Sequence, residues 1–450
     1  MSEITVPAEQ VFPILRENIL VDGFHVVIDL EKSHGAVIVD ALEGREYLDC
    51  YGYFATLPLG HNHPGMEDEG FRRSLMTAAL SNPANSDMYS REYAAFVKTF
   101  RELAVPDAFR YLFFIAGGAL AVENAMKVAF DWKARKNRAA GVPGGGDKIL
   151  HFRDAFHGRS GYTLSVTNTD PAKTRDFPKF DWPRVSNPYI DVPMDAEAMA
   201  VKEGQACAEI EAAFAADPHG IAGILIEPIQ GEGGDRHFRP EFFARLREYA
   251  DRHEALLIFD EVQTGLGATG AMWAFEHTGV TPDLIAFGKK TQVGGVMSTR
   301  RVDEVEENVF HVSSRINSTW GSNLVDMVRC ARYLEIIHEE GLVENAARVG
   351  AVMKAGLEAL SADVPGVTNI RGKGLFLALD LPDGETRAAV RQGCWERGLA
   401  VLPSGPRSIR FRPPLVLREA QAERALEILR GVVEEVVSVE GLSRSPSHPG

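Results

Sequence analysis

The sequence predicts an α/β fold with a mainly parallel sheet, because short apolar strands alternate with amphipathic helices through the middle of the chain. Three strand-like runs, Gly223–Ile229, Leu256–Val262 and Asp283–Gly288, are apolar and bounded by Gly, Pro or charged residues. Between the first two lies Arg239–Ala255, which has apolar residues at helical spacing and Pro240 near its start. Largely apolar strands separated by such helices are typical of a parallel sheet that is covered on both faces.

A smaller α+β unit is expected beyond about residue 325. Leu324–Glu340 and Leu342–Leu360 have the pattern of long helices, and they are followed by a strand-like run at 374–381 and a short return through 401–415. The expected organisation is an N-terminal segment (1–60) that packs with the small domain, a large domain (61–325), a small C-terminal domain (326–440) and a disordered tail (441–450).

The composition argues against several classes of partner. The 450 residues carry 48 Lys and Arg against 63 Asp and Glu, and the net charge of −15 would repel nucleic acid and anionic lipid. The four cysteines are isolated, without the close spacing of a zinc or redox motif. We see no signal peptide and no apolar run of the roughly 18 residues that a membrane helix needs. We therefore expect a cytoplasmic protein whose partners are small molecules.

A pair of glycines before a predicted helix is a candidate phosphate site. Phe113–Gly118 runs into Ala119–Asn137, where Val122, Met126 and Phe130 recur every four residues. Free backbone N–H groups at a helix start attract anions. The spacing differs from the G-x-G-x-x-G of dinucleotide sites, and an ordinary tight turn is the alternative.

A carboxylate and a lysine follow two of the predicted strands. Asp260 ends the run LLIFD, and Lys289 follows DLIAFG, 29 residues later. Ligands of α/β proteins bind at the carboxyl ends of parallel strands, so both side chains should lie at one mouth of the sheet. A lysine there can react with a carbonyl compound if its surroundings lower its pKa, whereas a solvated lysine and an ion-paired or helix-capping aspartate are the alternatives. The GKKT sequence lacks the upstream glycine of a Walker motif, which is replaced by Asp283.

Two arginines are candidates for binding carboxylates. Arg159 in FHGRSG and Arg410 in IRFRPP carry guanidinium groups that can bind a carboxylate through two parallel hydrogen bonds, although each could also be a solvated surface residue. His157 is expected to have a structural or packing role. The turn GHNHP (60–64) lacks convincing ligand spacing, so we expect no metal site.

Together and in this order, these segments resemble the class III (ω-amino) aminotransferases, which are fold type I enzymes dependent on pyridoxal 5'-phosphate. The resemblance runs from about Val26 to Val433. It rests on the motifs GHNHP (60–64), GGALAVENAMK (117–127), FHGRSG (156–161), EPIQGEGG (227–234), FDEVQTG (259–265), FGKK (287–290), NSTWGSN (317–323) and RFRPPL (410–415). It implies a cofactor-binding large domain with a mainly parallel sheet of the seven-stranded type, and a smaller α+β C-terminal domain.

The resemblance also implies roles for individual residues. Lys289 would bind pyridoxal phosphate covalently and then move the substrate proton, with Lys290 facing away. Asp260 would keep the pyridine nitrogen protonated, which makes the ring an electron sink. Gln263 would hydrogen-bond the phenolic oxygen of the ring. The other cofactor contacts would be Phe156 stacked on the ring, the N–H groups of Gly118 and Ala119 at the phosphate, and Thr319 at the phosphate of the neighbouring subunit in a homodimer.

Two departures from the common family pattern narrow the resemblance. The usual phosphate loop, Ser-Gly-Ser/Thr-Glu-Ala, is GGALA (117–121) here, so phosphate binding must depend on the backbone and on Thr319. The lysine is followed by TQVGGVM, where the family usually has glycines and a proline. With FPKFDWPR (177–184), GDRHFRPEFF (234–243) and RINSTWG (315–321), both departures are similar to the L-lysine 6-aminotransferase branch.

That branch implies transfer of the ε-amino group of L-lysine to 2-oxoglutarate, giving 2-aminoadipate 6-semialdehyde and L-glutamate by a ping-pong mechanism. Arg159 would hold the distal carboxylate of either substrate, and Arg410 the α-carboxylate of 2-oxoglutarate. Glu232 would pair with Arg410 and mask it while lysine is bound. Gln263 and Asn317, at the lysine α-carboxylate, are the remaining expected substrate contacts, and Tyr53 and Phe54 are expected to line the pocket.

Other functions on the same fold stay open at this point. The nearest is another ω-aminotransferase, acting on ornithine, acetylornithine or 4-aminobutyrate, because pocket shape decides which substrate length is accepted. An aminomutase or racemase needs no second keto acid, so the two arginines and Glu232 argue against it. The retention of Lys289, Asp260 and Gln263 argues against a non-catalytic relative.

Overall fold

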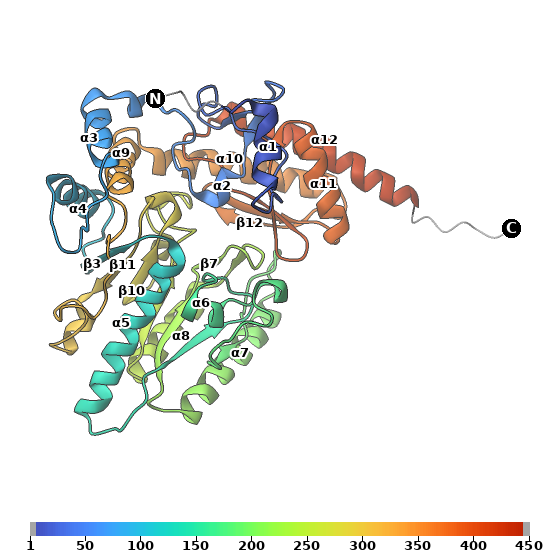
Figure 1. Ribbon diagram of the computed structural model, residues 1–450. Helices are drawn as coiled ribbons and strands as arrows, with labels where there is room; N and C mark the ends of the chain where they lie inside the picture. Colours follow the sequence, from blue (N-terminus) through green and yellow to red (C-terminus); the bar gives the residue numbers. More distant parts are fainter. Residues whose placement is uncertain (1–5, 444–450) are drawn as a thin grey trace.

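A seven-stranded sheet forms the centre of the chain (Figure 1). The computed structural model describes the backbone of residues 6–443 and the side chains up to residue 437. The strand order is β3-β11-β10-β9-β6-β4-β5, and only β11 runs antiparallel to its neighbours. The strands are β3 (Phe109–Ile115), β4 (Lys148–Phe152), β5 (Arg184–Val185), β6 (Ile221–Ile226), β9 (Leu256–Asp260), β10 (Leu284–Phe287) and β11 (Gly294–Thr299). The predicted α/β class with a mainly parallel sheet is confirmed.

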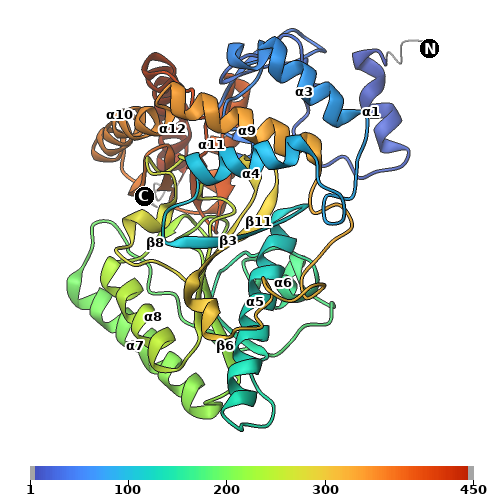
Figure 2. The same cartoon turned by 90° about the vertical axis from the view of Figure 1, so that its left-hand side faces the viewer.

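Helices cover both faces of this sheet, as the apolar strands required. Alternate residues of β9 belong to different clusters: Leu256 packs in the layer of α5 (Gly118–Ala139), and Leu257 in the layer of α8 (Pro240–Arg252). Figure 2 shows α5 on one side of the sheet, and α7 (Ala196–Ala216) and α8 on the other. Pro240 stands at the first helical position of α8, where its missing N–H removes no hydrogen bond.

The predicted strand Gly223–Ile229 is divided in the structure. β6 ends at Ile226, and β7 (Ile229–Gln230) forms a hairpin with β8 (Arg236–His237). The break falls at Glu227 and Pro228, since proline cannot donate to a strand ladder. The hairpin carries the GEGG segment beyond the carboxyl end of the sheet.

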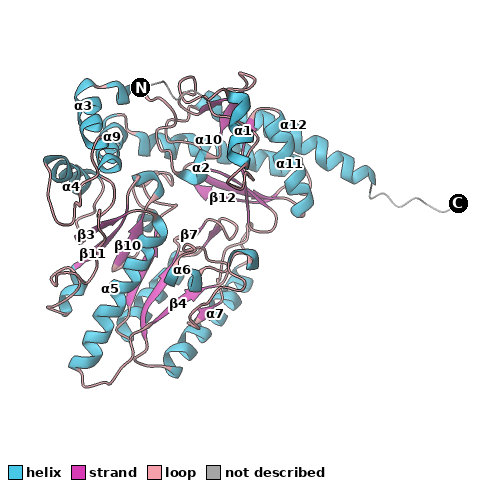
Figure 3. Cartoon of the chain, in the orientation of Figure 1, coloured by secondary structure: helices cyan, strands magenta, loops and turns pink. Residues whose placement is uncertain are grey.

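The C-terminal part is α+β, as expected, and is built on a four-stranded antiparallel sheet (Figure 3). The strands run in the order β12 (Thr368–Lys373), β13 (Phe376–Asp380), β16 (Ser408–Phe411) and β15 (Leu402–Ser404). The helices of this part are α9 (Leu324–Glu339), α10 (Leu342–Asp363), α11 (Gly384–Glu396) and α12 (Glu419–Ser443). Helix α12 ends at Ser443, residues 444–450 lie outside the described chain, and the tail expected at 441–450 stays a prediction.

The N-terminal segment packs against the C-terminal part. A three-stranded sheet joins β1 (Val37–Val39) and β2 (Glu46–Asp49) to β14 (Leu399–Ala400), which pairs with β2 in parallel. The other helices before the large sheet are α1 (Ala8–Arg16), α2 (Gly52–Ala55), α3 (Glu69–Ala79) and α4 (Arg91–Leu103), and α3 and α4 contact α9. The domain boundaries proposed from the sequence stay a prediction.

Short helices and turns complete the chain. The short elements are α6 (Gly161–Val166) and the 3-10 turns η1 (Pro64–Glu67), η2 (Pro171–Lys173), η3 (Ala274–His277), η4 (Lys289–Thr291) and η5 (Arg300–Glu304).

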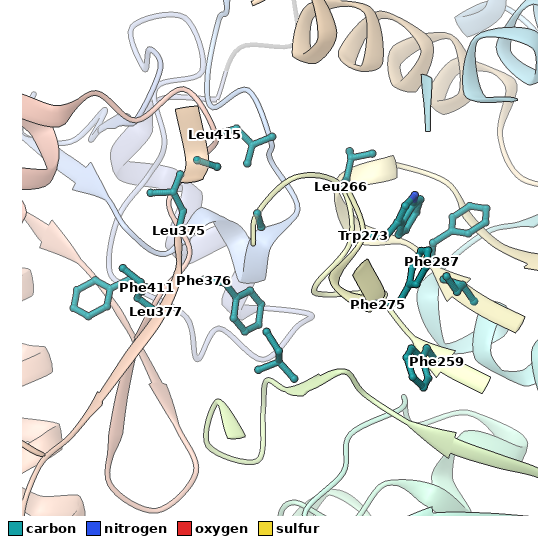
Figure 4. Close-up of a cluster of buried hydrophobic side chains, with 14 of the residues drawn as sticks. Phe259, Leu266, Trp273, Phe275, Phe287, Leu375, Phe376, Leu377, Phe411 and Leu415 are labelled. Carbon is teal, nitrogen blue, oxygen red and sulfur yellow. The ribbon is translucent and has the colours of Figure 1, made fainter. Parts of the chain in front are cut away.

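One apolar cluster joins the seven-stranded sheet to the four-stranded sheet. Figure 4 shows Leu375 and Phe376 on the C-terminal side of this cluster, and Phe259 and Phe287 on the side of the seven-stranded sheet. Within the described residues, no helix combines the length and apolar character that a membrane crossing requires.

Candidate active site

A cavity of about 580 Å³ lies at the carboxyl ends of β6, β9 and β10. Its walls come from widely separated segments, including the cavity-lining Tyr53 and Phe54 near the N-terminus. Both were expected there, and eight further predicted site residues line the cavity: Gly118, Ala119, Phe156, Arg159, Glu232, Asp260, Gln263 and Lys289. Arg410 lies behind Glu232 and Gln263 and contacts both.

Lys289 presents a reactive amine to this cavity. It follows β10 in the left-handed backbone conformation (φ 53°), which is unusual for a residue other than glycine and typical of functional sites. Burial, with a further contribution from Arg410, lowers the pKa of its amine to about 8, and the amine has no hydrogen-bond partner among the described residues. Lys290 instead donates to the carbonyl oxygens of Gln263 (2.6 Å) and Ala55 (3.4 Å), outside the cavity lining.

Asp260 is held by a buried histidine. Its Oδ2 lies 2.7 Å from Nδ1 of His157, and its Oδ1 accepts the Val262 N–H at 3.0 Å. Oxygen Oγ1 of Thr167 accepts the backbone N–H of His157, which fixes the position of the histidine. The sequence suggested a structural or packing role for His157, without a partner. Its position beside the strand-end carboxylate depends on a contact across 103 residues that the sequence pattern does not indicate.

The start of α5 forms a narrow part of the cavity wall. Gly117 precedes the helix with φ 94°, and a Cβ atom on Gly118 would lie 2.6 Å from Val262 Cγ1. A Cβ on Gly158 would lie 2.6 Å from the Cβ of Ala119. The backbone of these segments therefore approaches the cavity directly, and the positive end of a 22-residue helix faces it.

Two arginines fix the amide of Gln263. Its Oε1 accepts from Nη1 of Arg410 (3.4 Å) and from Nε and Nη2 of Arg412 (3.4 and 3.3 Å). Because the oxygen faces the arginines, the amide NH₂ group is the end available to a ligand. Arg412 itself pairs with the buried Asp235 and stacks on Phe376, 3.2 Å from the ring centroid. Arg412, which stands two residues after Arg410 in RFRPPL, was not among the predicted site residues.

Glu232, in the β7–β8 hairpin, lies between two cations. Its Oε2 pairs with Nη2 of Arg410 at 3.2 Å, and its Oε1 pairs with Nζ of Lys173. Although burial raises the pKa of Glu232, Arg410 and Lys173 hold it below its usual value. Lys173 lines the cavity and was not predicted as a site residue.

A left-handed turn at Gly52–Ala55 brings Tyr53 and Phe54 to the cavity. All four residues have φ between 52° and 66°. Asp49 anchors the turn, because its Oδ1 accepts the N–H groups of Tyr51 (2.9 Å) and Gly52 (2.7 Å). Such a conformation costs roughly 1–2 kcal/mol for each residue other than glycine, so the surrounding contacts must maintain it.

Three predicted substrate or phosphate contacts are exposed in this chain. Arg159 lies at the cavity rim, and its guanidinium forms no ion pair with a described residue. Asn317 and Thr319 do not line the cavity of their own chain. Their predicted roles stay predictions.

The residues around the cavity fit pyridoxal 5'-phosphate. Asp260 would supply a carboxylate for a pyridinium nitrogen, Lys289 an amine for the aldehyde, and Gln263 an amide donor for the phenolic oxygen. Phe156 would supply a flat apolar surface for the ring, and the start of α5 would supply backbone N–H groups for the phosphate. The absence of a hydroxyl from residues 117–121 leaves the backbone as the phosphate donor in this segment.

Known proteins resemble this chain over nearly all of its length. The sequence model of the aminotransferase class-III family matches residues 21–433. The L-lysine-epsilon aminotransferase of Mycobacterium tuberculosis is 52% identical, covering 95% of this chain and 96% of its own, and that of Amycolatopsis lactamdurans is 48% identical, covering 94% and 95%. The solved structure of the lysine aminotransferase from M. tuberculosis in the internal aldimine form superposes with a TM-score of 0.95, at 52% identity, covering 96% of this chain and 100% of that one.

Proposed function

The chain belongs to the class-III aminotransferases, enzymes that use pyridoxal 5'-phosphate, and we propose that it transfers the ε-amino group of L-lysine to 2-oxoglutarate. The products are 2-aminoadipate 6-semialdehyde and L-glutamate. The observation that carries the proposal is the pairing of Arg410 with Glu232 in a cavity with a second arginine, Arg159, at its rim, which forms no ion pair with a described residue. Similarity to L-lysine-epsilon aminotransferases over nearly the whole chain supports L-lysine as the amino donor.

The chemistry divides between the cofactor and the residues that surround it. When bound, pyridoxal phosphate supplies an electron sink that stabilises negative charge at the substrate carbon that loses a proton. The Nζ atom of Lys289 moves that proton, and a pKa of about 8 suits proton transfer near neutral pH. Asp260 holds a proton on the ring nitrogen, and His157 keeps the carboxylate oriented. The amide of Gln263, held by two arginines, binds the phenolic oxygen.

The arginines allow one site to accept two substrates of different length. Arg159 binds the distal carboxylate, which is the α-carboxylate of lysine or the γ-carboxylate of 2-oxoglutarate. Arg410 binds the α-carboxylate of 2-oxoglutarate. When lysine places a methylene group there instead, Glu232 neutralises the guanidinium, because a buried unpaired charge is costly. Asn317 adds a contact to the lysine α-carboxylate.

The active unit we propose is a cytoplasmic homodimer in which Thr319 reaches the partner's phosphate site. Large apolar side chains stay exposed on the single chain near the predicted contact: Met88, Tyr89 and Trp320 are 77%, 80% and 51% exposed. The Ser86 hydroxyl donates to the Thr319 carbonyl at 3.1 Å, so the 84–88 and 317–323 segments form one surface. Sedimentation velocity of the holoenzyme should give twice the chain mass, and a stable monomer would contradict the proposal.

A half-reaction titration tests the donor. L-Lysine, L-ornithine, 4-aminobutyrate and L-glutamate are added separately to purified holoenzyme without keto acid, and the absorbance of the bound cofactor is followed. Lysine and glutamate should convert it, whereas ornithine and 4-aminobutyrate should have little effect. Faster conversion by ornithine or 4-aminobutyrate would assign the protein to another ω-aminotransferase activity.

A further inference from the structure

Lys173 lines the cavity and has no role in the proposed mechanism. It ends the short turn η2, whose preceding residue Asp170 accepts the Ala172 N–H at 2.9 Å. Its Nζ pairs with Oε1 of Glu232 and lies 3.4 Å from Oγ1 of Thr169. Only 22% of the side chain is exposed, so the ion pair is shielded from solvent more than a surface pair would be.

We propose that Lys173 is a positioning residue for Glu232: it holds the Glu232 carboxylate while Arg410 binds the carboxylate of 2-oxoglutarate or L-glutamate. The inference rests on the proposed function, since it assumes that Arg410 receives a substrate carboxylate in one half-reaction. It assigns to Lys173 a part in selecting between the two substrates.

The geometry allows this role because the two cations use different oxygens of one carboxylate. Arg410 contacts Oε2, whereas Lys173 contacts Oε1. The Lys173 contact can therefore persist when the Arg410 contact is replaced by a substrate carboxylate. Lys173 has further support that does not depend on Glu232, since its ammonium lies 5.6 Å from the ring centroid of Phe156 and near Thr169.

The charges of the group favour the same conclusion. Lys173 and Arg410 carry two positive charges and Glu232 one negative charge, so the group has a net charge of one positive. The carboxylate of 2-oxoglutarate or L-glutamate neutralises that charge when it binds. Without Lys173, the carboxylate would have to displace Glu232 from Arg410 and leave it unpaired in a largely enclosed site. L-Lysine places no carboxylate at Arg410, so its binding does not require that displacement.

The first test compares the two half-reactions in variants of the holoenzyme. Lys173→Met keeps the length of the side chain and removes the charge, and Lys173→Arg restores it. We expect Lys173→Met to raise the KM for L-glutamate and 2-oxoglutarate about tenfold, the effect of about 1.4 kcal/mol, with the KM for L-lysine unchanged or lower. Lys173→Arg should recover most of the loss. The control is Lys148→Met, which removes a lysine paired with Asp217 away from the cavity and should change neither half-reaction.

The second test measures binding without turnover. Isothermal titration of the holoenzyme with glutarate, which has two carboxylates, should show about tenfold weaker binding in Lys173→Met. Hexanoate, which has one carboxylate, should bind with the same affinity in both proteins. In a Glu232→Gln background, Lys173→Met should have no further effect on glutarate binding.

The outcomes separate this inference from the proposed function. If wild-type holoenzyme converts neither L-lysine nor L-glutamate, the proposed function fails before any variant is made. If the wild type behaves as proposed and Lys173→Met weakens both half-reactions equally, or neither, the inference about Lys173 is wrong. An undiminished effect in the Glu232→Gln background would also overturn it, because Lys173 would then act independently of Glu232.

Discussion

Replacing Arg412 with methionine should destabilise the holoenzyme by about 3–5 kcal/mol, the usual effect of removing one partner of a buried ion pair. The side chains of Arg412 and Asp235 are each 1% exposed, and Arg412 pairs with Oδ1 of Asp235, whose Oδ2 has no hydrogen-bond partner among the described atoms. Burial lowers the pKa of Arg412 to about 10, although Asp235 opposes this shift. The variant would therefore leave a carboxylate buried without a cation. Methionine retains apolar contact with Phe376, so the charge is the main loss.

A second substitution separates the charge from the position of Gln263. Arg412→Met combined with Asp235→Asn removes the unpaired charge, and should be about 2 kcal/mol more stable than the single variant because a buried neutral amide costs less than a carboxylate. Both variants lose the two Arg412 hydrogen bonds to Oε1 of Gln263. Both should therefore show kcat/KM reduced about tenfold, which corresponds to about 1.4 kcal/mol.

The assay is equilibrium unfolding in urea, followed by circular dichroism and by tryptophan fluorescence, with half-reaction kinetics on the same preparations. Arg72→Met is the control, since Arg72 pairs with Glu67 where both side chains are more than 60% exposed, and it should change stability by less than about 1 kcal/mol. A loss below about 1 kcal/mol in Arg412→Met would refute the reasoning. So would a double variant no more stable than the single one.

Three further predictions concern the cavity. The pKa of Lys289 is lowered to about 8, so between pH 8 and the ordinary lysine range the unfolded chain binds a proton that the folded apo-protein does not. The stability of the apo-protein should therefore rise with pH in that range. In Lys289→Met the urea midpoint should rise less over the same range, and an equal rise would contradict the lowered pKa. Glu232→Ala should spare the 2-oxoglutarate half-reaction and raise the KM for L-lysine at least about tenfold, whereas equal loss in both would exclude the masking role. Gly233→Ala should reduce activity, because the added Cβ would lie 2.1 Å from the Asp154 carbonyl oxygen. The control is Gly204→Ala, at a helical position in open space, which should stabilise the fold by about 1 kcal/mol. Unchanged activity in Gly233→Ala would show that the hairpin adapts to the added atom.

The sequence predicted the parts of the site that depend on local order along the chain. Asp260 and Lys289 each follow an apolar run, and parallel pairing of β9 with β10 brings the two strand ends to one edge. The start of α5 was likewise indicated by the glycines and the apolar repeat that follows them.

The missed features depend on contacts between distant segments. Strand β11 begins with two glycines that resemble a loop, yet a Cβ on Gly295 would lie 2.3 Å from the Phe287 ring. These glycines are therefore required by close packing of neighbouring strands, which outweighs their low strand propensity. Lys173 and Arg412 were missed for a related reason, because a cation in a loop or beside a proline acquires its role only from a partner far along the chain.

The sheet that joins the two ends of the chain has a consequence for biosynthesis. The N-terminal strand β2 pairs with β14, and the Arg45 guanidinium donates to the carbonyl of Glu396, 351 residues further on. At roughly 5–20 residues per second, a ribosome needs about 20–70 s to deliver that partner. Until then β2 can pair only with β1, because β14 has not yet been translated. The cavity also lacks Arg410, which contacts Glu232 and Gln263. The three-stranded sheet and the Arg410 side of the cavity can therefore form only after almost all of the chain has been translated.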